Sequence, residues 1–551
     1  MLFNSYEFIF LYLPAVVAGF YTLNLLNRTA AIVWLGGASL FFYGCWNWRF
    51  VPLLVGSVVF NYGMGILLMR GDNQMSPRLR LFIVISAVGA NLAALAYYKY
   101  TNFFVDNLNL ALPHPLVIST VILPLGISFF TFTQIAFLID TYVREAREPS
   151  FTSYLLFVTY FPHLIAGPIL HHSEMMPQFE RREAMPISEN IAVGLSIFVI
   201  GLFKKVVIAD SISRFAAPGF DGVHDGAVLS LIEAWSAPVA YTFQLYFDFS
   251  GYSDMAIGLS QMFGIRLPLN FDSPLKARSI IEFWQRWHMT LTRYLRLYLY
   301  TPLVTKIMSW RMERGYGISR QDMRSSGGFA AMVAVPLFYT MGLAGIWHGA
   351  GAQFFVFGLL HGAYLTVNHA WRTFRGPARP SRAITAKLLV VRDVSLTFIA
   401  VVVANVFFRA GSVHDAWSIL RSMAGLNGVV LPAGSTTSLG PLAAPLAQLG
   451  ARFEPALPFF QGSSEVAAFV LLFFIVWALP NTQQLVARFS PVPADATAER
   501  REEPPLIAKI PLVRSLVEWR PNISSAVLVG ALAAVACLNL HHVSEFLYFE
   551  F

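Results

Sequence analysis

The chain has 551 residues, of which 56% are hydrophobic and only 13% charged, and its mean hydropathy is +0.57. This composition excludes an ordinary water-soluble protein and indicates a chain that crosses a membrane many times. The formal net charge of +8 is explained by basic connectors on one side of a membrane, so membrane lipid is expected around the protein and nucleic acid is excluded as a partner.

Twelve segments are apolar and long enough to cross a hydrocarbon core about 30 Å thick. They are residues 8–26, 30–45, 50–69, 81–98, 116–139, 188–209, 227–249, 328–348, 350–370, 388–409, 464–480 and 523–540. The sequence therefore predicts an all-α, polytopic membrane bundle that forms a single domain over residues 1–551. The two cysteines, Cys45 and Cys537, lie in apolar runs and support neither a disulfide nor a metal site.

Lysine and arginine gather in four connectors, Arg70–Arg80, Arg144–Arg147, Arg266–Arg324 and Arg372–Arg392. Placing all four in the cytoplasm puts both termini on the external side. Residues 266–324, with eleven basic and four acidic side chains, are then a cytoplasmic, basic, amphipathic segment. Residues 411–463 are predicted to be an external loop insertion.

The segment Phe151–His172 is apolar but is interrupted by two prolines and a glycine. A re-entrant or kinked element buried in protein is therefore predicted instead of a lipid-facing helix. His163, His171 and His172 are candidate metal ligands, but no fourth ligand stands at a telling spacing, so a polar cavity wall or interface is preferred and no metal is predicted.

Polar residues also interrupt the apolar run Gln244–Ile265, where Asp248, Tyr252 and Asp254 occur. Carboxylates are costly at membrane depth, so these side chains should face a water-filled cavity or pair with basic residues. Capping of a broken helix and lining of a substrate site are equally compatible with the pattern.

A continuous helix is predicted from Ile281 to Pro302, where the proline would end it. Its apolar face holds Trp284, Trp287, His288, Leu291 and Leu295, and its other face holds Arg286, Arg293 and Arg296. Such a helix is expected to lie at the cytoplasmic membrane surface. From the residues alone, His288 is more readily explained as a satisfied core residue than as a ligand.

Glycines surround a second tryptophan-histidine pair, Trp347-His348, within Gly342–Gly362. They would allow a backbone or ligand to approach closely, and an imidazole at this depth can exchange protons near neutral pH. On chemistry alone, catalytic and structural roles for His348 are evenly balanced. His361 is a weaker candidate, with a helix-packing hydrogen bond as its expected role.

Several motifs together resemble the membrane-bound O-acyltransferase family, and within it the bacterial branch of alginate O-acetylation proteins. They are PLGISFFTFTQIAFLIDTY at Pro124–Tyr142, FPHLIAGPI at Phe161–Ile169, YFDFSGYSDMAIGL at Tyr246–Leu259, NFDSPLKARSIIEFWQRWHMTL at Asn270–Leu291, GIWHGA at Gly345–Ala350 and the ending EFLYFEF. The resemblance covers nearly the whole chain, although Leu431–Ser464 is longer than the branch's pattern.

The resemblance implies a bundle with a central funnel or tunnel, in which His348 is the catalytic residue and His288 its second polar partner. It also implies a bacterial inner-membrane location, so that the external side predicted for both termini from the basic connectors is the periplasm. Acetyl-CoA would be the acyl donor, with no tightly bound cofactor. A periplasmic or membrane-tethered acetyltransferase would complete transfer to an exported polysaccharide.

The remaining candidates for substrate or donor binding are polar and aromatic residues of the basic segment and of the motifs quoted above. Arg286, Arg293 and Arg296 could meet the phosphates of acetyl-CoA on the cytoplasmic face. The other candidates are Trp287, Trp347, Asp248, Tyr252, Asp254 and Asn270.

Two alternatives stay open at this point. The first is acylation of another envelope polymer, namely peptidoglycan or teichoic acid, by the same kind of enzyme. The second is a transporter or export channel without chemistry, in which histidines and carboxylates relay protons. The second alternative would be expected to show an internal inverted repeat, and none is apparent in the sequence.

Overall fold

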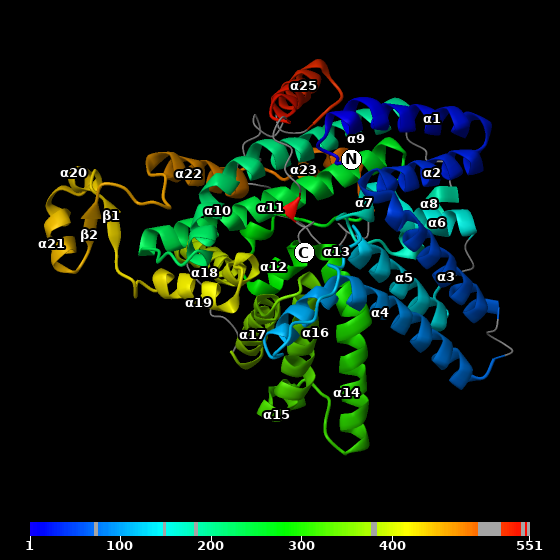
Figure 1. Ribbon diagram of the computed structural model, residues 1–551, viewed down its shortest axis with the longest axis horizontal. Coiled ribbons are helices and arrows are strands. Elements are labelled where there is room, and N and C mark those ends of the chain that lie inside the picture. The colour runs from blue at the N-terminus through cyan, green and yellow to red at the C-terminus, as the bar shows by residue number, and fades with distance from the viewer. Residues whose placement is uncertain are drawn as a thin grey trace.

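A computed structural model describes residues 1–70, 75–146, 150–180, 186–375, 383–493, 519–540 and 546–547. The described chain is a bundle of helices with one small two-stranded sheet (Figure 1), so the all-α prediction is confirmed. The N-terminal part contains η1 (Phe8–Tyr12), α1 (Leu13–Leu26), α2 (Arg28–Asn47), η2 (Trp48–Phe50), α3 (Val51–Arg70), α4 (Pro77–Asn109) and α5 (Ile127–Tyr142).

The middle of the chain ends with α11, a long helix that is buried along most of its length. The elements of this part are α6 (Phe151–Thr159), α7 (Phe161–Leu164), α8 (His172–Glu180), α9 (Ile187–Phe203), η3 (Lys204–Ala209), α10 (Asp210–His224) and α11 (Leu231–Met262). The basic segment follows, with η4 (Pro274–Lys276), α12 (Ile280–Arg286), α13 (Met289–Leu295), η5 (Arg296–Tyr300), α14 (Thr301–Glu313) and η6 (Asp322–Arg324).

The last third begins with helices that hold the second tryptophan-histidine pair. They are α15 (Ser326–Phe329), η7 (Ala330–Ala334), α16 (Val335–His348), α17 (Ala352–Phe374), α18 (Ala383–Arg409) and α19 (Val413–Met423). A small lobe of β1 (Val430–Pro432), α20 (Ser435–Leu439), η8 (Gly440–Leu442), α21 (Ala443–Gln448) and β2 (Arg452–Glu454) follows. The chain then forms α22 (Ser463–Ala478), α23 (Thr482–Leu485), η9 (Ala487–Phe489) and α25 (Ile523–Leu538).

Six helical runs among the described residues are long and apolar enough to cross a membrane. They are Phe8–Leu26, Arg28–Arg70, Pro77–Asn109, Ile187–His224, Ser326–His348 and Lys387–Arg409, with shorter apolar helices at Ser463–Ala478 and Ile523–Leu538. The protein is therefore a multi-pass membrane protein. The predicted spans 30–45 and 50–69 correspond to α2 and α3, which follow one another within the run Arg28–Arg70 and are separated by extended backbone at Asn47.

The predicted helix over residues 116–139 is wrong in its first half. The chain is irregular and largely exposed from 113 to 126, and α5 begins only at Ile127. Pro124 and Gly126, which has a left-handed φ of 69°, account for the late start, because neither favours the helical conformation. By contrast, residues 151–172 are broken into α6, α7 and a buried irregular stretch, so the prediction of a kinked, buried element is confirmed.

Residues 411–463, predicted as a loop insertion, are folded and extend to one end of the molecule (Figure 1). The strands β1 and β2 pair in parallel, with Val430 opposite Arg452. The helix α19 packs on α10, α11 and α18, which joins the insertion to the bundle. The periplasmic location of this lobe stays a prediction.

The central helix α11 packs closely on α9 through opposed glycines. A Cβ atom at Gly201 would lie 2.6 Å from the carbonyl oxygen of Gly251, and one at Gly194 would lie 2.6 Å from that of Gly258. Only residues without a side chain allow two helix backbones to approach so closely. This contact fixes α11, on which part of the site described below is built.

We expect Gly201→Ala to lower the melting temperature and the folded yield in detergent, because the added methyl would overlap α11. Overpacking of this kind costs about 1–3 kcal/mol. Gly37→Ala is the matched control, since nothing lies within 4 Å of a Cβ there, and removing a helical glycine should leave stability unchanged or slightly higher. Equal melting temperatures for the two variants would contradict the close packing of α9 on α11.

Candidate active site

The prediction of one helix from Ile281 to Pro302 is wrong at both its middle and its end. The helix α12 stops at Arg286, Trp287 is extended, and His288 adopts the left-handed conformation with φ 43° and ψ 53° before α13 begins. Pro302 lies in the first turn of α14, where a missing N–H is tolerated, so the helical path continues past it. A non-glycine residue in this conformation is uncommon and must be held there by its surroundings.

Asn270 holds His288 at this break. The side-chain oxygen of Asn270 lies 3.0 Å from Nδ1 of His288 and accepts from the Oγ1 of Thr290 at 2.9 Å. The backbone N–H of Thr290 also points to this oxygen at 3.4 Å, and because a backbone N–H can only donate, the acceptor atom must be the carbonyl oxygen. Nδ1 of His288 therefore carries its hydrogen, and the neutral ring presents a lone pair at Nε2.

His348 is the last residue of α16 and is 6% exposed. The helices α16 and α17 touch through Gly345 and Gly358, where a Cβ at Gly345 would lie 3.1 Å from the Cα of Gly358. This approach places the imidazole of His348 against the rings of Phe357 and Phe408, at centroid distances of 6.0 and 5.2 Å.

Two side chains of α4 bind the carbonyl groups that end α16. The ammonium of Lys99 donates to the carbonyl oxygens of Trp347 and, at 3.2 Å, of His348. The hydroxyl of Tyr100 donates to the carbonyl of Ile346 at 2.7 Å. The last carbonyls of a helix lack partners within the helix and carry partial negative charge, so a lysine there both satisfies them and fixes the helix end.

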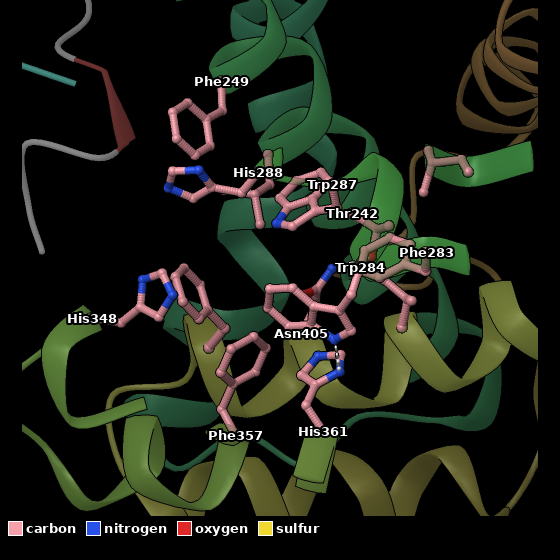
Figure 2. A pocket seen from close by; sticks show the side chains of 14 residues that line it. Thr242, Phe249, Phe283, Trp284, Trp287, His288, His348, Phe357, His361 and Asn405 are labelled. Atoms are coloured by element: carbon pink, nitrogen blue, oxygen red, sulfur yellow. Dashed lines mark hydrogen bonds between the residues drawn. The ribbon is translucent and has the colours of Figure 1, made fainter. Parts of the chain in front are cut away.

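One buried cavity brings His288 and His348 together (Figure 2). Its wall is mostly aromatic and comes from α11, the basic segment, α16, α17 and α18. The lining residues are Thr242, Leu245, Phe249, Leu275, Phe283, Trp284, Trp287, His288, His348, Phe357, His361, Val401, Asn405 and Phe408. Of the residues selected from sequence, His288, His348 and Trp287 lie in this wall.

The cavity also contains polar residues that the sequence analysis did not place there. Nε1–H of Trp284 donates to Nδ1 of His361 at 3.2 Å, which is the packing hydrogen bond expected for His361. The side-chain nitrogen of Asn405 donates to Oγ1 of Thr242 at 3.0 Å. Asn405 could have been noticed, because an amide within the apolar run VVVANVFF is unusual in a membrane helix.

Trp347 points away from this cavity and stacks on Phe132 at 5.0 Å. Among the arginine candidates, Arg286 pairs with Glu282 at 3.0 Å, Arg293 pairs with Glu174, and Arg296 is exposed. These four residues lie outside the cavity wall, and their role in donor binding stays a prediction.

The polar residues of α11 serve a separate buried network. Asp248 pairs with Lys205 at 2.7 Å and accepts from the N–H of Leu547 at 3.2 Å. Asp254 pairs with Lys204 at 2.6 Å. Tyr252 packs between the rings of Phe3 and Phe546, at 5.1 and 4.6 Å. Partners of opposite charge explain how these carboxylates are tolerated inside the bundle.

The fold and the cavity define an integral membrane protein with two histidines brought together inside a helical bundle. A family model described as membrane-bound O-acyltransferase matches residues 81–311, which include His288 but not His348. The peptidoglycan O-acetyltransferase of Helicobacter pylori is 41% identical over 463 residues, covering 78% of this chain and 81% of that protein. The probable alginate O-acetylase AlgI of Pseudomonas aeruginosa is 36% identical, covering 77% and 75%.

A more distant relative is the teichoic acid D-alanyltransferase of Streptococcus thermophilus, 26% identical over 53% of this chain and 69% of that protein. The first two relatives are more than 30% identical to this chain, and the alignments cover at least three quarters of each of them. The chain therefore belongs to the membrane-bound O-acyltransferase family. It is an acyltransferase, and the family resemblance drawn from the motifs is confirmed.

We expect Lys99→Met to lower kcat on the order of tenfold with little change in the KM for the donor, because loss of the lysine would leave the end of α16, and thus His348, imprecisely placed. Acyl-transfer kinetics would measure this effect. Lys99→Arg should recover part of the activity, since a guanidinium can donate to the same carbonyls. Equal loss in the two variants, or a change confined to KM, would argue against this positioning role.

Proposed function

We propose that the protein is an O-acetyltransferase of the bacterial inner membrane that moves an acetyl group from cytoplasmic acetyl-CoA towards hydroxyls of an exported polysaccharide. A periplasmic or membrane-tethered acetyltransferase would finish the transfer. The observation that carries the proposal is that His288 and His348, which lie 60 residues apart in the sequence, line the same buried cavity.

The chemistry needs a base and an environment that excludes water. In the transfer, a bond forms between the acceptor oxygen and the acetyl carbon, the thioester C–S bond breaks, and CoA leaves as the thiol. His348 would take the proton of the acceptor hydroxyl as the C–O bond forms and return it to the sulfur. The aromatic wall would keep water from hydrolysing the thioester.

The hydrogen bond to Asn270 restricts what His288 can do. Its Nδ1–H is used by Asn270, so the neutral ring offers an acceptor at Nε2 and not a donor. Accepting a hydrogen bond from an N–H of the acyl donor fits this tautomer, whereas stabilising an oxyanion would require a protonated ring. We therefore assign His288 to orienting the acyl donor beside His348, since the single hydrogen of the acceptor hydroxyl goes to His348.

The basic segment supports an approach of the donor from its side of the cavity. Its helix α12 contributes Phe283 and Trp284 to the cavity wall, and Arg286 belongs to the same helix. Arg278, just before α12, and Arg296 in η5 are exposed and could meet phosphate groups of CoA. The aromatic residues at the cavity would then face the slender pantetheine chain.

Peptidoglycan is the second candidate acceptor. It is favoured by the 41% identity to a peptidoglycan O-acetyltransferase, beside 36% to a probable alginate O-acetylase. Both relatives are named for attaching acetyl groups to oxygen, which favours acetyl over D-alanyl as the transferred group. Membership of an acyltransferase family argues against the transporter hypothesis.

The test is acetyl transfer by the purified protein in nanodiscs, with radiolabelled acetyl-CoA as donor and unacetylated exopolysaccharide or peptidoglycan as acceptor. CoA release and label on the polymer are followed separately, with and without a membrane extract that supplies a partner. We expect His348→Ala to lower CoA release at least about 100-fold, as removal of a general base does. His288→Ala should lower it as well, because its cavity-facing acceptor is lost.

His414→Ala is the matched control, because its side chain is 93% exposed and lies on α19, outside the cavity. It should keep wild-type activity. Full activity of folded His348→Ala would contradict the assignment of the base. A wild-type protein that releases CoA neither alone nor with the extract would contradict acetyl-CoA as the donor.

A further inference from the structure

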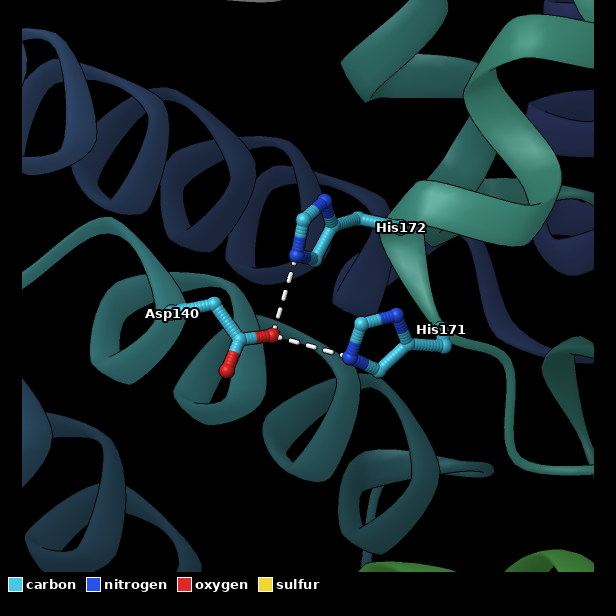
Figure 3. A group of neighbouring side chains, drawn as sticks. All are labelled: Asp140, His171 and His172. Carbon is cyan, nitrogen blue, oxygen red and sulfur yellow. Dashed lines mark hydrogen bonds and ion pairs between the residues drawn. The ribbon is translucent and has the colours of Figure 1, made fainter. Parts of the chain in front are cut away.

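A second cluster of titratable side chains lies away from the catalytic cavity. Asp140 lies near the end of α5, His171 directly precedes α8, and His172 is the first residue of α8. Nε2 of His171 lies 3.0 Å from Oδ2 of Asp140, and Nε2 of His172 lies 2.9 Å from the same oxygen (Figure 3). The two rings and the carboxylate thus converge on one point.

The charge of Asp140 needs a counterpart. The residue is 4% exposed, and a carboxylate so deeply buried is costly unless a positive charge lies beside it. Its ion pairs within the described chain are with the two imidazoles, and no described lysine or arginine pairs with it. Hydrogen bonds from the two imidazoles and from Tyr298, a protonated histidine, or a bound cation can each stabilise this carboxylate.

We propose that Asp140, His171 and His172 bind a divalent transition-metal ion, with zinc as the best match. The three ligand atoms lie within 4.8 Å of one another. Two imidazoles and one carboxylate are ligands that zinc prefers, whereas magnesium and calcium prefer oxygen alone. Metal–ligand bonds of about 2.0–2.1 Å require the two N···O separations to open by a few tenths of an ångström and the two imidazole nitrogens to lie at a similar separation from each other.

Two neighbouring hydroxyls complete the arrangement. The hydroxyl of Tyr298 lies 2.8 Å from Oδ2 of Asp140 and 3.2 Å from Nε2 of His171, so it can be a fourth ligand or an outer hydrogen-bond partner. Nδ1 of His171 lies 2.7 Å from Oγ of Ser173. If Nδ1–H donates to this oxygen, Nε2 is left unprotonated and directed at the metal, which is the usual arrangement for a metal-bound histidine.

The site would have a structural role. None of Asp140, His171, His172 and Tyr298 lines the cavity that holds His288 and His348. The four residues instead join α5, the start of α8 and η5 of the basic segment. A metal at this point would hold the basic segment against the bundle, and the inference does not depend on the acetyl-transfer proposal.

The competing arrangement has no metal, and both imidazoles donate from Nε2–H to Asp140. Metal analysis separates the two. We expect protein purified without a polyhistidine tag, incubated with zinc and gel-filtered, to retain about one zinc per chain by mass spectrometry of the metal. Cobalt(II) should bind in its place and give the visible absorption of a four-coordinate nitrogen and oxygen site.

The variants are chosen to keep the hydrogen bonds while removing the ligands. Asp140→Asn and His172→Gln retain polar side chains of similar size and should lower bound metal to background. Tyr298→Phe should weaken cobalt binding about 10- to 100-fold, as loss of an outer partner does. His414→Ala, whose exposed imidazole lies on α19, is the control and should retain the metal.

Stability gives a second readout. Zinc should raise the melting temperature of the wild type but not that of His172→Gln, because only the wild type would bind it. Wild-type protein that holds less than about a tenth of an equivalent after incubation with zinc would overturn the proposal and leave the hydrogen-bonded cluster. Equal metal content in wild type and in both ligand variants would overturn it as well.

Discussion

The hydrogen bond between His288 and Asn270 is the interaction on which the rest of the site depends. A polar ring in a largely apolar interior must find partners, and the left-handed conformation of His288 is strained unless its surroundings hold it. Asn270 does both, because its side chain binds the ring while its backbone carbonyl accepts from the N–H of Met289 at 2.9 Å. The break between α12 and α13, the tautomer of His288 and the direction of its Nε2 all follow from this residue.

The other histidine is held by a different device. His348 ends a helix, and its position is set by the contact of Gly345 with Gly358 on one side and by Lys99 and Tyr100 on the other. Neither support touches His288. The two imidazoles are therefore placed independently, by elements that meet only at the cavity, which explains why distant parts of the sequence must fold together before the site exists.

The sequence predicts the parts of this protein that depend on local pattern or on a specific motif. Long apolar runs predict the helical bundle, and prolines and glycine predict the broken element at 151–172. The motifs around His288 and His348 indicate the family to which the chain belongs. The sequence does not predict the break at Trp287, because the apolar spacing of residues 281–295 fits a continuous helix. The contact that stabilises the break comes from Asn270, which lies outside this predicted helix. Asp140 is missed for the same reason, since it lies 31 residues before His171.

Several long-range contacts attach the basic segment, residues 266–324, to the rest of the bundle. The basic segment is held at three points along its length, by Asn270 with Ser253 of α11, by Arg293 with Glu174, and by Tyr298 with Asp140. Glu174 of α8 contacts α13 itself through Arg293, and Asp140 of α5 contacts η5, which continues α13, through Tyr298. These two contacts fix the middle and the end of the helical path that follows His288, and Asn270 fixes its beginning. The cavity that holds His288 and His348 therefore depends on polar contacts, at Glu174 and Asp140, that contribute nothing to its lining.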